Sequence, residues 1–366
     1  MICCFSIFYP SQQEKMPLDF RKFPKIELHC HLDASVRIAT VADLGRQIGL
    51  MLPEPLAPAL VAPEICLDLA DFLLRIDLAL EVMQHRDQLI RIAREFVEDL
   101  ALDGVIYGEV RFAPQLHLRQ RLSLQEVVDA VYEGLLQGQQ AFGVATGLIL
   151  CCLRDESAQR SMEIARLALA NRDKVCGLDL AGDEARFSGA AHAEAFALAK
   201  REGLRRTVHA GEAAGAESIR EALDLLGAER IGHGVRIEES PEVEEIARTA
   251  AVTLEMCPLS NVQTRAATSL TNHPIERLLR KGLRVTVSTD ARTVSATSVS
   301  AEFDRLAKTF RWGPDEFWRC QHYAADAAFV SPQARVLLTK QFAEAGSANA
   351  TPGLTVLGRN SSSQVI

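Results

Sequence analysis

Eight short β-rich segments alternate with helical segments along most of the chain, and this alternation restricts the fold more than any other feature. Between the β-rich segments, apolar residues recur at three- and four-residue spacing, as in residues 88–104, 192–203, 216–227 and 241–250. The β-rich segments are residues 25–31, 105–112, 144–151, 174–180, 205–210, 229–234, 251–257 and 283–289. Such alternation predicts an α/β fold in which helices connect parallel strands.

Eight strand–helix units favour closure of the sheet into a (β/α)8 TIM-type barrel. A doubly wound open sheet is the rival arrangement. No G-x-G-x-x-G follows the first β-rich segment, which weakens a dinucleotide-binding version of that rival. Residues 38–88, between the first two β-rich segments, form an unusually long connection. We expect extra helices there, lying over the mouth of the barrel, where they can act as a lid.

The barrel domain is expected to span residues 17–345. Residues 1–16 form an N-terminal extension that is either disordered or precedes the real start, since fold-like sequence begins just after Met16. Residues 346–366 are small and polar, which predicts a disordered tail. The apolar part of the N-terminus has no basic residue before it, so we expect no signal peptide.

Composition narrows the class of partner. The formal net charge is -8, which gives no basic surface for nucleic acid or for an anionic membrane. Nine cysteines are scattered without a C-x-x-C pair, as is typical of reduced thiols. No apolar run reaches the roughly 18 residues needed to cross a bilayer. We therefore expect a cytoplasmic protein that acts on a small molecule, while the sequence carries no signal for an oligomeric state.

Histidines stand at the ends of several predicted strands. His29 and His31, in "KIELHCHLD", point to the same face of their strand because side chains alternate. His209 and His233 end two later strands, and Asp290 follows the last one. Barrel enzymes keep their reactive groups at these carboxyl ends, so we expect the five side chains to converge.

Three imidazoles and one carboxylate suit a zinc ion that keeps a position open for water. The alternative is that H-x-H arises by chance and that the histidines only fill polar gaps. The remaining histidines fall in predicted helices or loops and are interpreted as structural: His85, His117, His192, His273 and His322.

Seven motifs then occur in a familiar order: "KIELHCHLD", "EVRFAP", "LDLAGDE", "HAGE", "RIGHG", "CPLSNVQT" and "STD". From residue 17 to about residue 335, the chain resembles the adenosine deaminase family. The resemblance implies one zinc ion per chain, with these ligands: His29, His31, His209 and Asp290. It also implies that Glu212 donates a proton to the purine ring and that His233 orients the attacking water.

The same resemblance implies hydrolytic deamination of adenosine and 2′-deoxyadenosine to the inosine nucleosides and ammonia. Asp33 and Gly182 would hold the nucleoside, with His31 beside them, and Asp290 would count among the catalytic residues. Asp33 favours a nucleoside, because relatives that act on free adenine tend to have glutamate there. Gly182 can instead be a simple turn, and Asp33 can instead be the N-cap of the next helix.

Neighbouring residues receive other interpretations. Asp183 and Glu184 are expected in a solvated loop, and Cys30 is expected in the core, facing away from the metal. "CPLSNVQT" is interpreted as a loop near the site, with no ligand role for Cys257.

The chain departs from the family pattern at Ala291. The family usually has a second aspartate there, which bonds the imidazole nitrogen of the purine. Arg292, Thr293 or Ser295 can replace that contact or select a different base. The alternatives that stay open are free adenine, a modified adenosine and aminodeoxyfutalosine. A barrel with inert zinc is a further alternative, against which Glu212 and His233 speak, since neither is needed to hold a metal.

Overall fold

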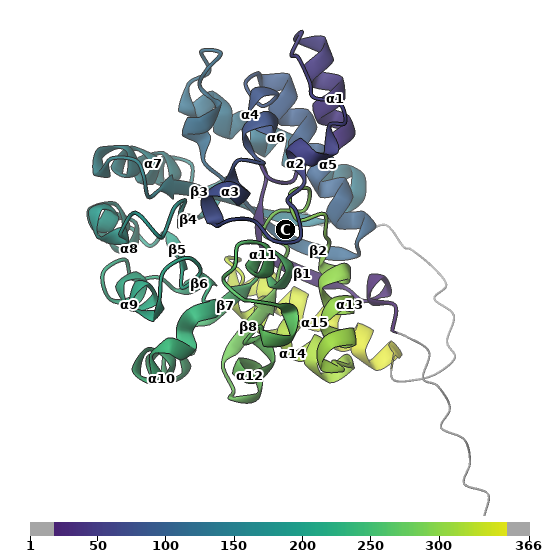
Figure 1. Ribbon diagram of the computed structural model, residues 1–366, viewed down its shortest axis with the longest axis vertical. Helices are drawn as coiled ribbons and strands as arrows, with labels where there is room; N and C mark the ends of the chain where they lie inside the picture. The colour runs from purple at the N-terminus through teal and green to yellow at the C-terminus, as the bar shows by residue number, and fades with distance from the viewer. Residues whose placement is uncertain (1–17, 350–366) are drawn as a thin grey trace, which may run out of the picture.

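A closed barrel of eight parallel strands forms the centre of the protein (Figure 1). The computed structural model describes residues 18–349. Its strands neighbour one another in sequence order. They are β1 (Lys25–His31), β2 (Val105–Phe112), β3 (Ala145–Leu153), β4 (Val175–Ala181), β5 (Arg205–Ala210), β6 (Arg230–His233), β7 (Thr253–Met256) and β8 (Arg284–Val287).

Two backbone hydrogen bonds join the end of β8 to β1. The Asp290 N–H donates to the His29 carbonyl at 2.9 Å, and the His31 N–H donates to the Asp290 carbonyl at 2.7 Å. Because the last strand meets the first, the sheet has no open edge there. The predicted (β/α)8 barrel is confirmed, and the doubly wound alternative is wrong.

Helices surround the barrel. They are α1 (Ile38–Gln47), α2 (Ala57–Leu60), α3 (Leu69–Leu73), α4 (Asp77–Glu81), α5 (Arg86–Leu102), α6 (Leu124–Phe142), α7 (Ala158–Ala170), α8 (Ala193–Arg201), α9 (Ala216–Asp224), α10 (Pro241–Thr249), α11 (Pro258–Gln263), α12 (Ile275–Arg280), α13 (Val299–Phe310), α14 (Pro314–Ala327) and α15 (Pro332–Asn349). Their ends follow local chemistry. Helix α6, for example, begins at a capping box of Ser123 with Glu126 and ends at Gly143, whose φ of 72° suits glycine.

The expected domain limits can be compared with the range of residues that the structure describes. Helix α15 continues past residue 345, the expected end of the barrel domain. The predicted N-terminal extension and the alternative start at Met16 lie outside the described residues, as does most of the predicted tail. Within the described part, no helix is long and apolar enough to cross a membrane.

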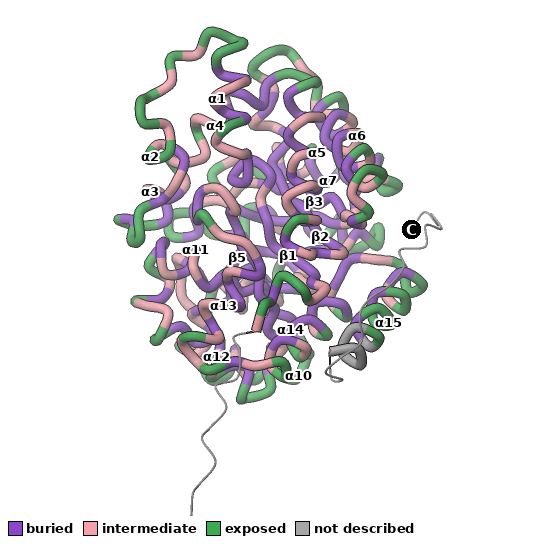
Figure 2. The backbone as a smooth tube through the Cα atoms, turned by 90° about the vertical axis from the view of Figure 1, so that its right-hand side faces the viewer, coloured by how far each residue is buried: buried purple, intermediate pink, exposed green. Residues whose placement is uncertain are grey.

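The extra helices predicted after the first strand are present. Helices α1 to α4 occupy the connection between β1 and α5, and α3 and α4 line the cavity at the carboxyl ends of the strands. Figure 2 shows α2, α3 and α11 on one side of the molecule and α15 on the other. At the opposite end of the barrel, α14 packs on β1, and its Gln321 side chain accepts the Ile26 N–H at 2.6 Å.

The two faces of the strands differ in polarity. Residues that face the helices are apolar and buried, and they form the main core of the molecule, as Val110, Leu178 and Leu254 illustrate. Alternate residues point into the barrel, and several of these are fully buried and charged: Glu109, Arg111, Asp179, Arg230 and Glu255. The interior of this barrel is therefore an ion network rather than the usual layers of branched apolar side chains.

Arg111 and Glu255 are central to that network. Arg111 donates from Nη2 to Glu255 at 2.8 Å and from Nη1 to Asp179 at 3.0 Å. Glu255 also pairs with Arg230 at 2.5 Å, and Arg230 donates to Glu109. Burial works to raise the pKa of Glu255, but Arg111 and Arg230 outweigh it and hold that pKa well below its usual range. Glu255 is therefore charged, and it depends on its two arginine partners.

Arg111→Met should lower the free energy of unfolding by about 3–5 kcal/mol, because Glu255 and Asp179 would lose a buried partner. Urea unfolding of metal-free protein measures this change. Arg248→Met is the matched control, since the pair of Arg248 with Glu245 is exposed and screened by solvent, so its loss should leave stability nearly unchanged. An equal effect of the two substitutions would contradict the structural importance of the interior network.

Candidate active site

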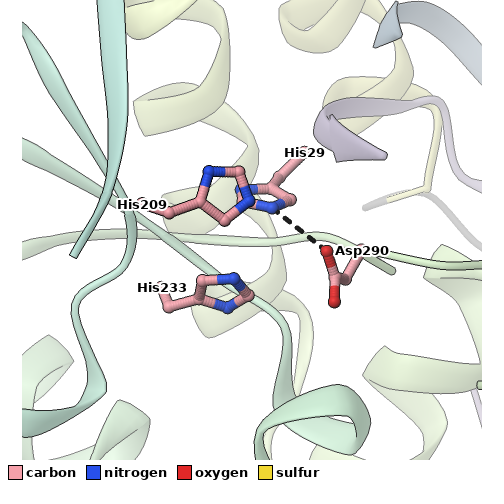
Figure 3. A group of neighbouring side chains, drawn as sticks. All are labelled: His29, His209, His233 and Asp290. Atoms are coloured by element: carbon pink, nitrogen blue, oxygen red, sulfur yellow. Dashed lines mark ion pairs between the residues drawn. The ribbon is translucent and has the colours of Figure 1, made fainter. Parts of the chain in front are cut away.

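A cluster of buried imidazoles and one carboxylate lies at the carboxyl ends of the strands. His29, His209, His233 and Asp290 each offer one ligand atom, and these atoms all lie within 4.8 Å of one another. Figure 3 shows the three rings and the Asp290 carboxylate turned toward a common point, although they come from β1, β5, β6 and the segment after β8. His29 Nε2 lies 3.2 Å from Asp290 Oδ1.

His31 stands beside this cluster. Its Nε2 atom is 3.1 Å from His209 Nε2 and 3.6 Å from Asp290 Oδ1. The structure thus brings together all five side chains expected at this end of the barrel. The tight group of four differs from the ligand set implied by resemblance in one member, because it contains His233 in place of His31.

Two of the rings are oriented by buried carboxylates of the interior network. His29 Nδ1 lies 2.8 Å from Glu255 Oε2, and His209 Nδ1 lies 3.1 Å from Asp179 Oδ2. Since a carboxylate accepts hydrogen bonds, each Nδ1 carries a proton, and in the neutral ring each Nε2 presents its lone pair. Carboxylates placed behind histidines in this way are typical of metal-ligating imidazoles.

Whether a cation fits the cluster can be judged from the surroundings of these Nε2 atoms. His29 Nε2 is buried and has no hydrogen-bond partner among the described residues, although it faces the carboxylate of Asp290. An unprotonated Nε2 and a carboxylate oxygen at this distance repel each other, and a cation between them, either a proton or a metal ion, turns the repulsion into attraction. Burial and Arg111 lower the pKa of His29, but the contacts with Asp290 and Glu255 outweigh them and raise it, so this position attracts a cation. The donor set of imidazole nitrogens with one carboxylate fits a divalent metal ion such as zinc.

His233 has a different partner. The Asn261 side-chain amide lies 2.9 Å from His233 Nδ1, and its oxygen accepts the Cys257 N–H at 3.2 Å. Because the amide oxygen faces a backbone donor, the amide nitrogen is the atom that donates to His233 Nδ1. His233 Nδ1 therefore accepts, and Nε2 carries the proton of the neutral ring. That tautomer suits hydrogen bonding to an oxygen and opposes metal ligation through Nε2.

Two residues of the site have left-handed backbone conformations. His233 has φ of 65° and Asp290 has φ of 64°, both uncommon for residues other than glycine. A strand cannot continue through such a residue, so the chain turns there and presents the side chain at the barrel mouth. The surrounding packing holds this local strain in place.

Glu212 lies at the edge of the cluster. Its Oε1 accepts the Thr264 hydroxyl at 2.9 Å, and its Oε2 is 3.4 Å from His233 Nε2. Burial, together with the nearby carboxylates of Asp290 and Glu184, raises the pKa of Glu212 well above its usual value. The site therefore favours a protonated Glu212, which can act as a proton donor.

Glu184 supports the segment that carries Glu212. It is buried, so the expected solvated position is wrong. Its carboxylate accepts the Ser218 hydroxyl and four consecutive backbone N–H groups. The accepted N–H groups belong to Gly211, Glu212, Ala213 and Ala214, at 2.6, 3.0, 2.7 and 3.1 Å. Asp183 is also buried, although it pairs with the exposed Arg186.

The cluster forms the floor of a cavity of about 580 Å³. Such a volume falls within the usual range for small-molecule sites, about 300–1,000 Å³. One wall of the cavity is largely apolar and comes from α3, α4, the end of β3 and neighbouring segments. It includes Leu69, Phe72, Leu73, Ile76, Leu80, Leu116 and Leu153. The cavity can therefore enclose a flat organic molecule with one edge against the polar floor.

Asp33 and Gly182 both line this cavity. Asp33 is not the N-cap of α1, which is Arg37, so that alternative is wrong. The Asp33 Oδ1 atom is buried without a hydrogen-bond partner among the described residues, and burial raises the pKa of Asp33 to about 7. Gly182 has φ of 95°, which favours glycine, so it is a turn residue as well as a wall of the cavity.

The sequence-based prediction missed several residues that orient the site. Glu255 and Asp179 lie in the middle of apolar strands, and a charge in such a run is a signal for an inward-facing partner. "CPLSNVQT" was expected as a loop, but it contains helix α11, whose Ser260 donates to Asp290 Oδ2 at 2.6 Å. Gly232 leaves room for His29, since a Cβ there would lie 2.9 Å from His29 Cε1.

Other sequence-based interpretations concern residues around the cluster. Cys30 is buried, as expected for a core residue. Of the five histidines interpreted as structural, His273 contacts the site indirectly, with its Nε2 3.1 Å from the Asn261 side-chain oxygen. None of those five belongs to the four-residue cluster within the described part of the chain.

A buried imidazole–carboxylate cluster at the mouth of a (β/α)8 barrel defines the class of this protein: a barrel enzyme built around a metal centre. The family model described as adenosine deaminase matches residues 24–345. The chain therefore belongs to the adenosine deaminase family.

Individual relatives agree with this assignment. An adenosine deaminase of Clostridium acetobutylicum is 38% identical over 322 residues, which cover 87% of this chain and 96% of that protein. The crystal structure of an adenine deaminase from Arthrobacter aurescens is 30% identical, with a TM-score of 0.83, covering 88% of this chain and 99% of that one. An N6-methyl-AMP deaminase of Arabidopsis thaliana is 27% identical, with a TM-score of 0.81, covering 90% and 98%.

Glu184→Ala should free the four N–H groups at residues 211–214, because no other acceptor replaces the carboxylate. We expect amide hydrogen exchange at these residues to accelerate and the free energy of unfolding to fall by about 1–3 kcal/mol or more. Asp183→Ala is the matched control in the same loop. Unchanged protection of residues 211–214 in Glu184→Ala would contradict the supporting role of Glu184.

Proposed function

We propose that this protein removes the amino group of adenosine and 2′-deoxyadenosine by hydrolysis, releasing ammonia and the inosine nucleoside. The observation that carries the proposal is the position of Glu212. Its carboxyl group favours the protonated form and lies beside His233 and the metal-type cluster, at the floor of a cavity of nucleoside size. Family membership supports the same reaction.

One zinc ion per chain would be held by four residues: His29, His31, His209 and Asp290. His31 is preferred to His233 because the Asn261 contact leaves a proton on His233 Nε2. When bound, zinc supplies a Lewis acid that lowers the pKa of coordinated water from about 15.7 toward 7.

The protein residues supply the remaining steps. An aromatic carbon that bears an amine is a poor electrophile until the neighbouring ring nitrogen is protonated. Glu212 delivers that proton, and the Thr264 hydroxyl holds its carboxyl group in place. His233 Nε2–H orients the oxygen of the attacking water. Asp290, fixed by Ser260, accepts the proton that the water loses and passes it to the departing amino group, which leaves as ammonia.

Asp33 and Gly182 would hold the nucleoside, with His31 beside them. The unpartnered Asp33 oxygen can accept a hydrogen bond from a ribose hydroxyl, which free adenine does not have. Gly182 lets the purine come close to the backbone. These contacts favour nucleosides over the free base.

The expected setting follows from the same chemistry. All seven cysteines of the described residues are free thiols, which fits the reducing cytoplasm. The expected partner is a small purine nucleoside, and no partner macromolecule is needed for the proposed reaction.

Ammonia release tests this function directly. Zinc-loaded protein is incubated with adenosine, 2′-deoxyadenosine and adenine, and zinc is counted per chain. We expect one zinc per chain and rapid release from both nucleosides, with adenine far slower because it cannot reach Asp33. Release from adenine alone would reassign the substrate to the free base. Full zinc occupancy without release from any of the three would favour an inert barrel.

Glu212→Gln should retain fold and zinc content while kcat falls by about 100- to 10,000-fold, because the amide cannot donate the required proton in the same way. Steady-state kinetics with adenosine measure the loss, and metal analysis confirms occupancy. Glu217→Gln, at an exposed position on α9, is the matched control and should retain full activity. Wild-type turnover by Glu212→Gln would remove Glu212 from the mechanism.

A further inference from the structure

An apolar surface borders the reactive cluster directly after Asp290. Ala291 is 1% exposed, lines the cavity and packs with Ala34, Phe72 and Val294. We refer to these four residues as the β8 wall. None of their side chains can donate or accept a hydrogen bond, so any atom of a ligand that meets the Ala291 part of the wall finds a hydrocarbon surface.

The backbone of this segment offers no spare donor. Each N–H group from residue 290 to residue 295 is already engaged within the protein. The acceptors are the carbonyls of His29, Thr289, Ala34 and Ala291 and the hydroxyl of Ser35. A ligand at the β8 wall therefore cannot be held by a main-chain N–H of these residues.

The polar side chains that follow Ala291 point elsewhere. Arg292 donates to Glu27 at 2.9 Å and to the Asp99 carbonyl of α5 at 3.3 Å, and the Thr293 hydroxyl donates to the Val36 carbonyl at 2.8 Å. Ser295 lies one turn behind Ala291, and its N–H donates to the Ala291 carbonyl at 2.8 Å. Its hydroxyl is buried and does not line the cavity. None of these three side chains therefore lines the cavity beside Ala291.

Barrel geometry tells which edge of a substrate meets the β8 wall. Glu212 follows β5, whereas Ala34 follows β1 and Ala291 follows β8. In a closed barrel of eight strands in sequence order, β5 lies across the mouth from β1 and β8. If Glu212 protonates the ring nitrogen beside the amine-bearing carbon, as the proposed function requires, the imidazole edge of the purine lies on the opposite side. That edge faces the β8 wall.

We propose that the site binds nucleosides with carbon at ring position 7, the pyrrolopyrimidine or 7-deazapurine nucleosides, at least as well as purine nucleosides. A purine nitrogen at that position gives up its bond to water on entering the site and gains no donor from the wall. A C–H group at the same position has no such bond to lose. Ala291 is the specificity-determining residue in this proposal, which rests on the proposed function for the orientation of the ring.

Binding of the two product nucleosides tests the proposal without a chemical step. Calorimetry compares inosine with 7-deazainosine on zinc-loaded protein. We expect 7-deazainosine to bind within threefold of inosine or more tightly. Weaker binding by more than threefold overturns the proposal, as does failure of both nucleosides to bind.

Adenosine turnover, measured separately, distinguishes this failure from failure of the proposed function. Turnover of adenosine with weak 7-deazainosine binding would overturn only the role of the β8 wall. Equal binding of the two products without turnover would overturn the deamination while the preference of the wall stands.

Substitution of the wall gives a second, independent readout. Ala291→Asn places an amide N–H beside the imidazole edge, so the ratio of the two dissociation constants should shift toward inosine by about two- to tenfold. Val294→Thr is the matched control, because it adds a hydroxyl to the same apolar cluster at a residue that does not line the cavity. A shift of the same size in Val294→Thr would contradict the assignment to Ala291. If Ala291→Asn fails to fold, the comparison on the unmodified protein decides the proposal.

Discussion

The carboxylate of Glu255 is the group on which both the barrel and the site depend. It receives Arg111 and Arg230 from inside the barrel and His29 from the mouth, so three strands orient one another through it. Because the arginines keep it charged, it holds a proton of His29 on Nδ1 and turns Nε2 toward the site. The orientation of the His29 ring is therefore fixed by the same ion pairs that fill the barrel interior. It does not depend on the movement of a loop.

Most of the fold could be predicted from the sequence, because parallel strands and crossover helices leave strong periodic signals. The eight β-rich segments match β1 to β8 to within a few residues, and the expected helix at 216–227 matches α9 at Ala216–Asp224. Helix α11 could not be predicted in this way, since its six residues begin with proline and half of their side chains are polar, without helical periodicity. Such a short helix is held by contacts with distant residues rather than by its own periodicity.

The candidate site was partly predictable for a related reason. Residues at strand ends, such as His209 and Asp290, can be identified from the sequence because barrel topology brings all strand ends together. The residues that orient them cannot be identified in this way. Glu184 looks like a loop residue until its carboxylate is seen to accept four backbone N–H groups, and Asn261 fixes a histidine tautomer from a segment 28 residues away in sequence. These contacts depend on side-chain direction, which sequence position alone does not determine.

The polar interior of the barrel also constrains how this architecture can be divided. Arg111 lies on β2, whereas its two carboxylate partners lie on β4 and β7. A fragment that ended after β4 would keep the arginine and Asp179 but lose Glu255, and the complementary half would keep Glu255 and Arg230 without Glu109. The first half would hold one arginine against two carboxylates, Glu109 and Asp179, and could not neutralise its own interior, so the two halves are not equivalent building blocks. Closure of the ring supplies Arg230, the cation that balances Glu109.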